Sequence, residues 1–234
     1  MLFKYSYFFL MVLFLLAGCA GKSSKKQDPE NAPDWDSIFT NQGLENVQES
    51  DSSIIVDLRY SSTNNFIGKD LYGSLEEAYL RPLAVDKLVQ ASEYLREECP
   101  DLRLYIYDAA RPRRIQQILW DQSGLPEDER AKYVANPQSG SIHNYGFAID
   151  LTVSDSKGNE LDMGTGYDHF TEKAHTDKEE ELIEKGILTE AQVQNRKILR
   201  NVMTKAGFIV LPSEWWHFDA LPRNEVVSEY AIVE

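Results

Sequence analysis

The chain has 234 residues, of which 42% are hydrophobic and 26% are charged, a composition that suits one globular domain and argues against a fibrous or disordered protein. The formal net charge is -14 at pH 7, so the protein repels phosphate backbones, and nucleic acid is not expected as a partner. We interpret the acidic excess as a solvated surface rather than as an acidic binding site.

The amino-terminal segment carries one lysine, Lys4, followed by an apolar run that ends in small residues, a pattern typical of a secretory signal. Residues 16–19, LAGC, resemble the bacterial lipobox, after which Cys19 would be the lipidated first residue of the mature protein. We expect a signal peptide over 1–18 and a lipid anchor on Cys19, and the alternative is an uncleaved anchor helix. Either way the domain lies in the cell envelope, on the periplasmic face, and Ala20 slightly favours the outer membrane.

A polar, proline-containing stretch follows Cys19, so we expect a flexible tether over 19–45 and one folded domain over 46–234. Cys99 is the other of the two cysteines, which excludes a disulfide framework in the mature chain. Stability must then come from the hydrophobic core or from a metal. Nothing in this pattern implies a protein partner.

The first predicted elements of the domain are a strand, a helix and a second strand. Alternating apolar residues over 54–58 predict a half-buried strand with Tyr60 at its exit. Pro82 opens a helical pattern that ends before Pro100. Residues 103–109, RLYIYDA, then predict a central strand.

Arg111 and Pro112 follow this strand directly, and the apolar spacing after them predicts a helix that begins at the proline. Arg111 therefore lies at a strand-to-helix junction, where loops carry function. The last clear helix spans 189–206, with Thr189 and Gln192 as a capping box. Because these elements show neither regular βαβ repetition nor a glycine-rich phosphate loop, we predict an α+β fold with a mainly antiparallel central sheet flanked by helices.

Four histidines are present, so the surroundings of each are informative. In the segment SIHNYGFAIDLTV, residues 141–153, Asp150 lies on the face of a predicted strand opposite to its apolar residues. His143 lies upstream, and a turn at Gly146 could bring its imidazole to the carboxylate, as a mixed nitrogen and oxygen metal site requires. A loop histidine and a salt-bridged aspartate explain the same spacing equally well.

The segment SEWWHFD, residues 213–219, adds His217 as a third candidate ligand and Glu214 as a carboxylate able to deprotonate a metal-bound water. Two histidines and one aspartate leave the fourth position of zinc open for that water. Because a regular strand would send Glu214 and His217 to opposite faces, we expect Glu214 in a bend before a strand that begins near Trp216.

Arg111 is the candidate electrophile, because a guanidinium beside the metal can stabilise the oxyanion that develops on a peptide carbonyl. The alternative is a structural arginine paired with Asp108. His169 and His175 lie in the charged segment 168–181, which predicts a solvated loop and helix. We therefore expect both histidines at the surface or around the site rather than on the metal.

Together, the segments SIHNYGFAID and EWWHF resemble the S-x-H-x(6)-D and E-x-W-H elements of the zinc D,D-peptidases that share a fold with the Hedgehog amino-terminal domain. The further blocks DLRYSSTNNFIGKDLYG, DAARP and MGTGYDHF are similar to the D-alanyl-D-alanine dipeptidase branch, the VanX-type enzymes. This resemblance extends from about Asp57 to Asp219, almost the whole predicted domain.

The resemblance implies one zinc ion per chain, bound by His143, Asp150 and His217. It implies that Glu214 is the general base and later the proton donor to the leaving amine. Arg111 would polarise the scissile carbonyl and hold the tetrahedral intermediate.

The resemblance also implies a substrate pocket, because Tyr60, Ser141 and Asp168 match residues that line the dipeptide pocket of the family. The tyrosine and the aspartate would receive the substrate ammonium, which distinguishes a dipeptide from a longer chain. Ala110 departs from the family, which has an aromatic residue before the Arg-Pro pair, and Ile142 stands where a small or polar residue often precedes the ligand histidine. Both departures concern the shape of the pocket.

The function expected from these features is zinc-dependent hydrolysis of the free dipeptide D-Ala-D-Ala in the cell envelope, for peptidoglycan turnover or nutrient recovery. No residue separates these roles from glycopeptide resistance. One alternative is a carboxypeptidase or endopeptidase that uses the same site on peptidoglycan stem peptides. A second is a non-catalytic binding module on the same fold, against which the presence of Glu214 and Arg111 argues.

Overall fold

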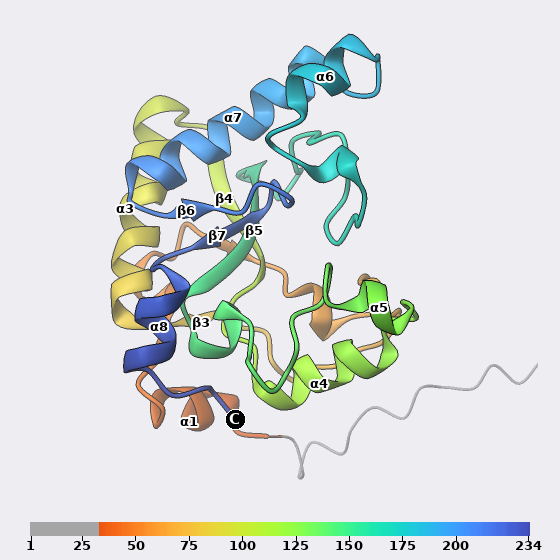
Figure 1. Cartoon of the computed structure of the whole chain (residues 1–234). Coiled ribbons are helices and arrows are strands. Elements are labelled where there is room, and N and C mark those ends of the chain that lie inside the picture. Colours follow the sequence, from red (N-terminus) through yellow and green to blue (C-terminus); the bar gives the residue numbers. More distant parts are fainter. Residues whose placement is uncertain (1–32) are drawn as a thin grey trace, which may run out of the picture. The chain divides into compact units, whose positions relative to one another are not determined.

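A five-stranded mixed sheet lies at the centre of the fold in the computed structural model, which describes residues 33–234 (Figure 1). Its strands, in sheet order, are β2 (Ile55–Val56), β4 (Leu102–Asp108), β5 (Ala148–Asp155), β7 (His217–Asp219) and β6 (Ile209–Val210). β2 runs parallel to β4, and the other neighbouring pairs are antiparallel. The predicted α+β fold with a mainly antiparallel central sheet is confirmed, with one parallel pair added.

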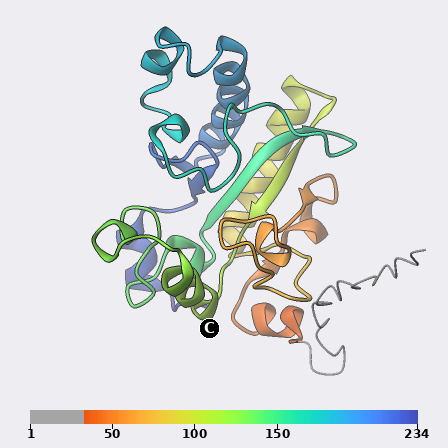
Figure 2. The ribbon, with the colours of Figure 1, turned by 90° about the vertical axis from the view of Figure 1, so that its right-hand side faces the viewer.

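The helices form layers on the two sides of this sheet. α3 and α7 contact each other and the same side of the sheet, whereas α4 and α5 lie toward the opposite side (Figure 2). A small second sheet pairs β1 (Glu45–Asn46) with β3 (Tyr79–Leu80). The α-helices are α1 (Trp35–Thr40), α2 (Val47–Ser50), α3 (Pro82–Glu98), α4 (Arg113–Gln122), α5 (Glu127–Arg130), α6 (Glu179–Glu184), α7 (Glu190–Lys205) and α8 (Arg223–Glu229), and the short 3-10 helices are η2 (Arg59–Ser61), η3 (Ile142–Tyr145) and η4 (Glu172–Ala174).

The two long helices follow their local signals. α3 begins at Pro82, whose missing N–H costs nothing at a first helical position, and ends before Pro100. α7 is capped at Thr189, whose hydroxyl accepts from the backbone of Gln192 at 3.2 Å, while the Gln192 side chain accepts from the backbone N–H of Thr189 at 2.9 Å. Gly207, with φ of +88°, follows its end. Both helix predictions are confirmed.

The strand predicted over 103–109 is confirmed as β4, and α4 follows directly after Pro112. The strand predicted over 54–58 is shorter than expected, because the chain leaves the sheet at Leu58 and enters η2. Tyr60 lies in η2, at the exit of β2 as predicted, and its side chain is buried.

The strand around Asp150 is buried on both faces, and Asp150 lies on the face opposite to the apolar residues, as the sequence predicted. Residues 148–154 are all buried. The polar face is covered by Tyr167, whose hydroxyl donates to Asp150 Oδ2 at 2.9 Å and whose ring packs edge-on against Trp216. The Asp150 side chain is therefore buried in the wall of a cavity rather than exposed to solvent.

The folded domain begins earlier than the predicted boundary at residue 46. Trp35 and Phe39 of α1 stack on each other with their ring centroids 5.6 Å apart, and both are buried in the main hydrophobic core. The tether predicted over 19–45 is thus too long at its carboxyl end. The expected signal peptide over 1–18 and the expected lipid anchor on Cys19 lie outside the described residues.

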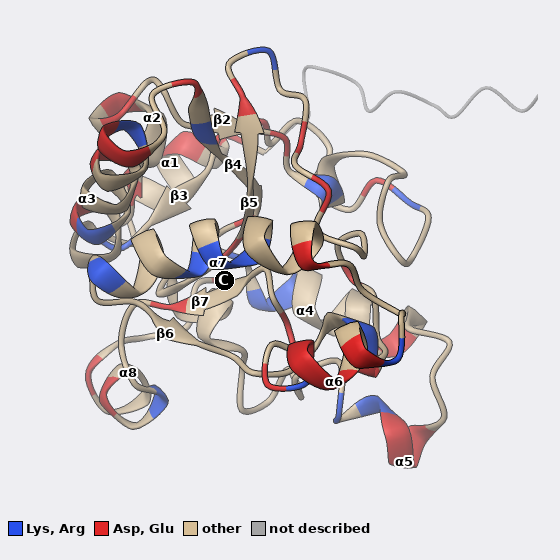
Figure 3. Cartoon of the chain, turned by 90° about the horizontal axis from the view of Figure 1, so that it is seen from above, with Lys and Arg blue, Asp and Glu red and all other residues tan. Residues whose placement is uncertain are grey.

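The acidic residues are distributed over several surface elements. Figure 3 shows Asp and Glu on α3, α5 and α6 rather than gathered in one place, which fits their interpretation as a solvated surface. Across residues 33–234, no helix combines the length and the apolar character that a membrane span needs.

Candidate active site

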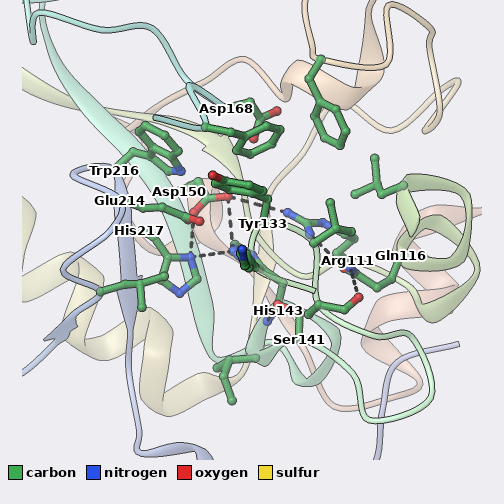
Figure 4. Close-up of a pocket in the computed structure, with 18 of the residues that line it drawn as sticks. Arg111, Gln116, Tyr133, Ser141, His143, Asp150, Asp168, Glu214, Trp216 and His217 are labelled. Atoms are coloured by element: carbon green, nitrogen blue, oxygen red, sulfur yellow. Dashed lines mark hydrogen bonds and ion pairs between the residues drawn. The ribbon is translucent and has the colours of Figure 1, made fainter. Parts of the chain in front are cut away.

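Three elements bring His143, Asp150 and His217 together (Figure 4). η3 carries His143, and the antiparallel register of β5 and β7 places Asp150 directly opposite His217. His143 Nε2 lies 3.2 Å from His217 Nδ1 and 3.3 Å from Asp150 Oδ2, and His217 Nδ1 lies 3.0 Å from Asp150 Oδ1. All three side chains are buried, and their ligand atoms lie within 4.8 Å of one another, as a shared cation requires.

Both imidazoles are oriented by a partner on the side away from this cluster. His143 Nδ1 lies 2.7 Å from the carbonyl oxygen of Ala109, and His217 Nε2 lies 2.9 Å from Asp219 Oδ1. Each ring can donate its N–H to that acceptor, which leaves the unprotonated nitrogen facing Asp150. Two imidazole lone pairs and one carboxylate thus converge on one point, and this donor set fits a divalent metal ion.

The charge of Asp150 also fits a site for a divalent metal ion. Burial raises the pKa of this carboxyl. His143 and His217 beside it lower the pKa by more than burial raises it, so the group stays ionised. An ionised carboxylate flanked by two imidazole nitrogens is a common ligand set of catalytic metal sites.

Local sequence explains why His143 points inward. The Ser141 hydroxyl accepts from the backbone N–H of His143 at 3.4 Å, and the Asn144 side chain accepts from the backbone N–H of Ser141 at 2.6 Å, a capping box that starts η3. Gly146, with φ of +77°, ends it in the left-handed conformation, at the turn that the sequence predicted. The backbone N–H of Arg111 donates to the carbonyl oxygen of His143 at 3.0 Å and fastens η3 to the end of β4.

Glu214 lies in a turn before β7, as predicted, and the strand begins at His217 rather than Trp216. Trp215 and Trp216 are both buried, and Trp215 Nε1 donates to Thr165 Oγ1 at 2.7 Å. The two tryptophans therefore anchor the bend that brings Glu214 beside Asp150 and His217 (Figure 4). They serve packing rather than chemistry.

The environment of Glu214 favours a proton on its carboxyl. Burial raises the pKa of Glu214, His217 acts against this rise, and the nearby charge of Asp150 adds to it. A carboxyl whose pKa lies above its usual value is better placed to take up a proton and to release it again near neutral pH.

Arg111 is buried and lies beside the cluster. Its Nε and Nη2 donate to Asp108 Oδ2 at 2.8 and 2.5 Å, and Nη2 lies 3.7 Å from Asp150 Oδ2. The guanidinium carbon also lies 5.2 Å from the centre of the Tyr60 ring. From the sequence, a structural pairing of Arg111 with Asp108 was the alternative to a place in the active site. In the structure, Arg111 both pairs with Asp108 and lies at the site.

Tyr60 and Asp168 meet at one end of the pocket. The Tyr60 hydroxyl donates to Asp168 Oδ2 at 3.1 Å, and Asp168 adopts a left-handed φ of +55°, unusual for a residue other than glycine. Burial raises the pKa of Asp168 well above its usual range, and the charge of Asp150 raises it further, although Arg111 and Tyr60 lower it. Among residues 33–234, no lysine, arginine or histidine forms an ion pair with this carboxyl, and Arg111 and Tyr60 offset the effect of burial only in part.

One cavity of about 260 Å³ joins the candidate residues. Ile142 also lines the cavity, whereas Ala110, although buried, does not. His169 and His175 lie outside the cluster and line an adjoining hollow of about 200 Å³, which shares Glu214 with the cavity. The eight residues that the sequence singled out and that line the cavity are Tyr60, Arg111, Ser141, His143, Asp150, Asp168, Glu214 and His217.

Sequence reasoning missed several residues of the site. Asp219 had a usable signal, since alternation along a strand places it on the same face as His217. Gln116 had none, because a single glutamine in a helix forms no pattern, whereas Tyr167 lies next to Asp168 in the block MGTGYDHF. Phe66, Tyr133 and Phe170 come from three distant segments and surround the cavity, with the Phe66 and Phe170 rings 5.1 Å apart and the Tyr133 and Phe170 rings 5.3 Å apart.

Replacing Asp219 by alanine is expected to lower the metal affinity about 10- to 100-fold, because His217 loses the acceptor that orients its ring. Metal titration of the chelated protein, followed by calorimetry, measures this change. An Asp219→Asn variant keeps an oxygen acceptor and should lose less. An unchanged affinity in Asp219→Ala would show that Asp219 does not orient the imidazole.

Comparison with known proteins agrees with this site. The profile of the peptidase M15 family, described as D-Ala-D-Ala dipeptidase, matches residues 40–232. The D-alanyl-D-alanine dipeptidase of Escherichia coli is 36% identical over 168 residues, covering 72% of this chain and 79% of that protein. The proteins of that name from Streptomyces coelicolor and Enterococcus faecalis are 30% and 28% identical, covering 74% and 75% of this chain and 88% and 91% of those proteins.

A solved LD-carboxypeptidase structure aligns with a TM-score of 0.36 at 21% identity, covering 65% of this chain and 66% of that chain, a likeness too distant to bear on function. The family match covers most of the chain and contains all eight candidate residues. The chain belongs to the D-Ala-D-Ala dipeptidase family of M15 metallopeptidases.

Proposed function

We propose that this protein is a zinc-dependent dipeptidase that hydrolyses free D-Ala-D-Ala to D-alanine. The observation that carries the proposal is one cavity that holds a metal-ligand cluster, a separate carboxylate, a buried guanidinium and, at one end, the Asp168 carboxyl in contact with Tyr60. The names of the relatives in Escherichia coli, Streptomyces coelicolor and Enterococcus faecalis support the substrate.

Zinc is the metal that suits this donor set best, because three protein ligands of the imidazole and carboxylate type leave a fourth position open. Zinc bound to His143, Asp150 and His217 would supply an activated water and a Lewis acid for the substrate carbonyl. His143 and His217 keep their lone pairs toward the metal because Ala109 and Asp219 accept their other protons.

Glu214 is the proton carrier in this proposal. It lines the cavity beside His217 without belonging to the cluster, so its carboxylate is free to accept a proton from the attacking water. Its raised pKa lets it keep that proton long enough to pass it to the nitrogen of the leaving D-alanine. One carboxyl therefore serves first as base and then as acid.

Arg111 stabilises the charge that develops during attack. Its guanidinium is held by Asp108 and stays protonated, because burial lowers its pKa less than Asp108 and the neighbouring tyrosines together raise it. Because it is buried and oriented, this guanidinium stabilises a developing oxyanion more strongly than it stabilises the neutral carbonyl of the substrate. Arg111 thus contributes mainly to kcat.

Asp168 and Tyr60 would bind the amino terminus of the dipeptide. An ammonium group placed against Asp168 supplies the cation that this carboxyl lacks and restores its ionised form. A longer peptide has a neutral amide at that position and leaves the carboxyl buried without a partner. Ser141, which caps η3 and lines the cavity, can offer its hydroxyl to the other end of the dipeptide.

The test is a comparison of D-Ala-D-Ala with its N-acetylated form and with a stem pentapeptide ending in D-Ala-D-Ala. We expect D-alanine release from the free dipeptide and a loss of at least about 100-fold in kcat/KM for the capped dipeptide, because the buried carboxyl is left unpaired. Activity on the pentapeptide alone would contradict the proposal and favour a D,D-carboxypeptidase or endopeptidase.

We also propose that the enzyme is anchored to the envelope through lipid on Cys19, which the lipobox-like sequence LAGC supports. A Cys19→Ala variant is then expected to lose incorporation of labelled fatty acid and to leave the membrane fraction. Cys99→Ala is the matched control and should keep the label. Equal labelling of both variants would contradict the assignment.

A further inference from the structure

Gln116 is a buried polar residue in the wall of the cavity, on the otherwise apolar inner face of α4. It is 1% exposed, and its helical neighbours Ile115 and Leu119 belong to the hydrophobic core. Its amide oxygen accepts from Arg111 Nη1 at 2.9 Å, and its amide nitrogen donates to the carbonyl oxygen of Ala135 at 2.9 Å (Figure 4). Both ends of the amide are therefore used.

The contact to Arg111 completes the support of the guanidinium. Arg111 Nε and Nη2 both donate to the same oxygen, Asp108 Oδ2. The guanidinium can therefore still rotate about this one oxygen. Gln116 holds Nη1, the nitrogen at the other end. With both contacts in place the plane of the guanidinium is fixed, and Nη2 stays near Asp150 and the metal-ligand cluster.

The contact to Ala135 joins the same amide to a wall of the cavity. Residues 131–135 follow α5 and line the cavity, and within them Tyr133 packs on Phe170, which also lines it. The Gln116 side chain therefore links the segment 131–135 to Arg111 and helps to position both.

We infer that Gln116 is a positioning residue for catalysis, which fixes the guanidinium of Arg111 in the orientation that meets the developing oxyanion and ties it to the segment 131–135. The inference rests on the role proposed for Arg111 in dipeptide hydrolysis. Because the oxyanion contact strengthens in the transition state, misplacing the guanidinium lowers kcat and leaves KM nearly unchanged.

The first test compares Gln116→Met with Gln117→Met, the equivalent change at the next residue of α4, which is exposed. Methionine keeps the length of the side chain and removes both hydrogen bonds. We expect kcat of Gln116→Met on D-Ala-D-Ala to fall about tenfold or more relative to Gln117→Met, with KM within about twofold. Gln116→Glu, which keeps an acceptor for Nη1 in either protonation state, should regain most of kcat. A kcat of Gln116→Met equal to that of Gln117→Met overturns the inference.

The second test repeats Gln116→Met in an Arg111→Lys background, in which the planar fork that Gln116 orients is gone. We expect the substitution to cost little further kcat there, because the two residues act as one unit. A general folding defect would persist in this background. If Gln116→Met lowers kcat by the same factor in both backgrounds, the inference is overturned, while the role of Arg111 stays intact. Wild-type kcat in Arg111→Lys alone instead overturns the role proposed for Arg111, and the inference with it.

Discussion

Replacing Glu214 by glutamine is expected to lower kcat for D-Ala-D-Ala by about 1000-fold, within the range that general acid-base catalysis supplies, while zinc stays bound at one ion per chain. Glutamine has nearly the same shape and fills the same turn, but its amide cannot accept the proton of the attacking water. Glu214 lies outside the cluster of His143, Asp150 and His217, so the metal site should remain complete. Steady-state kinetics and metal analysis of the same preparation measure both quantities.

Glu180→Gln is the matched control for this substitution, because it makes the same chemical change at an exposed position of α6. It should retain the activity and the zinc content of the wild type. A Glu214→Gln variant that loses zinc as well as activity would show that Glu214 acts as a ligand, and one that keeps most of its kcat would show that another group carries the proton.

Replacing His217 by alanine is expected to abolish turnover by removing the metal. His217 supplies one of three ligand atoms, and the remaining pair, His143 and Asp150, cannot hold a cation with comparable strength. The loss in zinc affinity should exceed the 10- to 100-fold change typical of residues that only orient a ligand. Titration of the chelated variant with zinc, followed by activity and by bound metal, gives the affinity.

His175→Ala is the control for His217→Ala, because His175 is a half-buried histidine that lies outside the metal cluster. It should bind zinc with wild-type affinity. If His217→Ala kept one zinc per chain after dialysis, the assignment of His217 as a ligand would be wrong. If Glu214→Gln and His217→Ala lost metal to the same degree, the division of roles between them would also be wrong.

The parts of the fold that the sequence predicted well are those with local causes. α3 and α7 are bounded by prolines, a capping box and a glycine, and each of these signals acts within a few residues. α1 was missed because its stability is not local: Trp35 and Phe39 become core residues through contacts with Tyr72 and Tyr79, which lie far along the chain. A short polar segment with two aromatic residues has no periodicity that could predict this burial.

In the site, too, the features with local causes could be predicted and those that depend on distant contacts could not. The residue types and spacing around His143, Asp150 and His217 were recognisable as a pattern. Their approach depends on the pairing of β5 with β7, which places His217 3.0 Å from Asp150, and on the position of η3, which places His143 3.3 Å from it. The burial of the Asp150 face of β5 could not be predicted, because Tyr167, from a loop without secondary structure, covers it. Gln116 could not be predicted, since its role exists only where α4 meets Arg111 and Ala135.

The measurement that tests the central claim most directly is D-alanine release from D-Ala-D-Ala by purified protein that has been chelated and then titrated with zinc. The account predicts no turnover without metal, recovery that saturates at one zinc per chain, and no recovery in Glu214→Gln under the same conditions. Full turnover in the metal-free protein, or zinc bound at one per chain without any release of D-alanine, would contradict it.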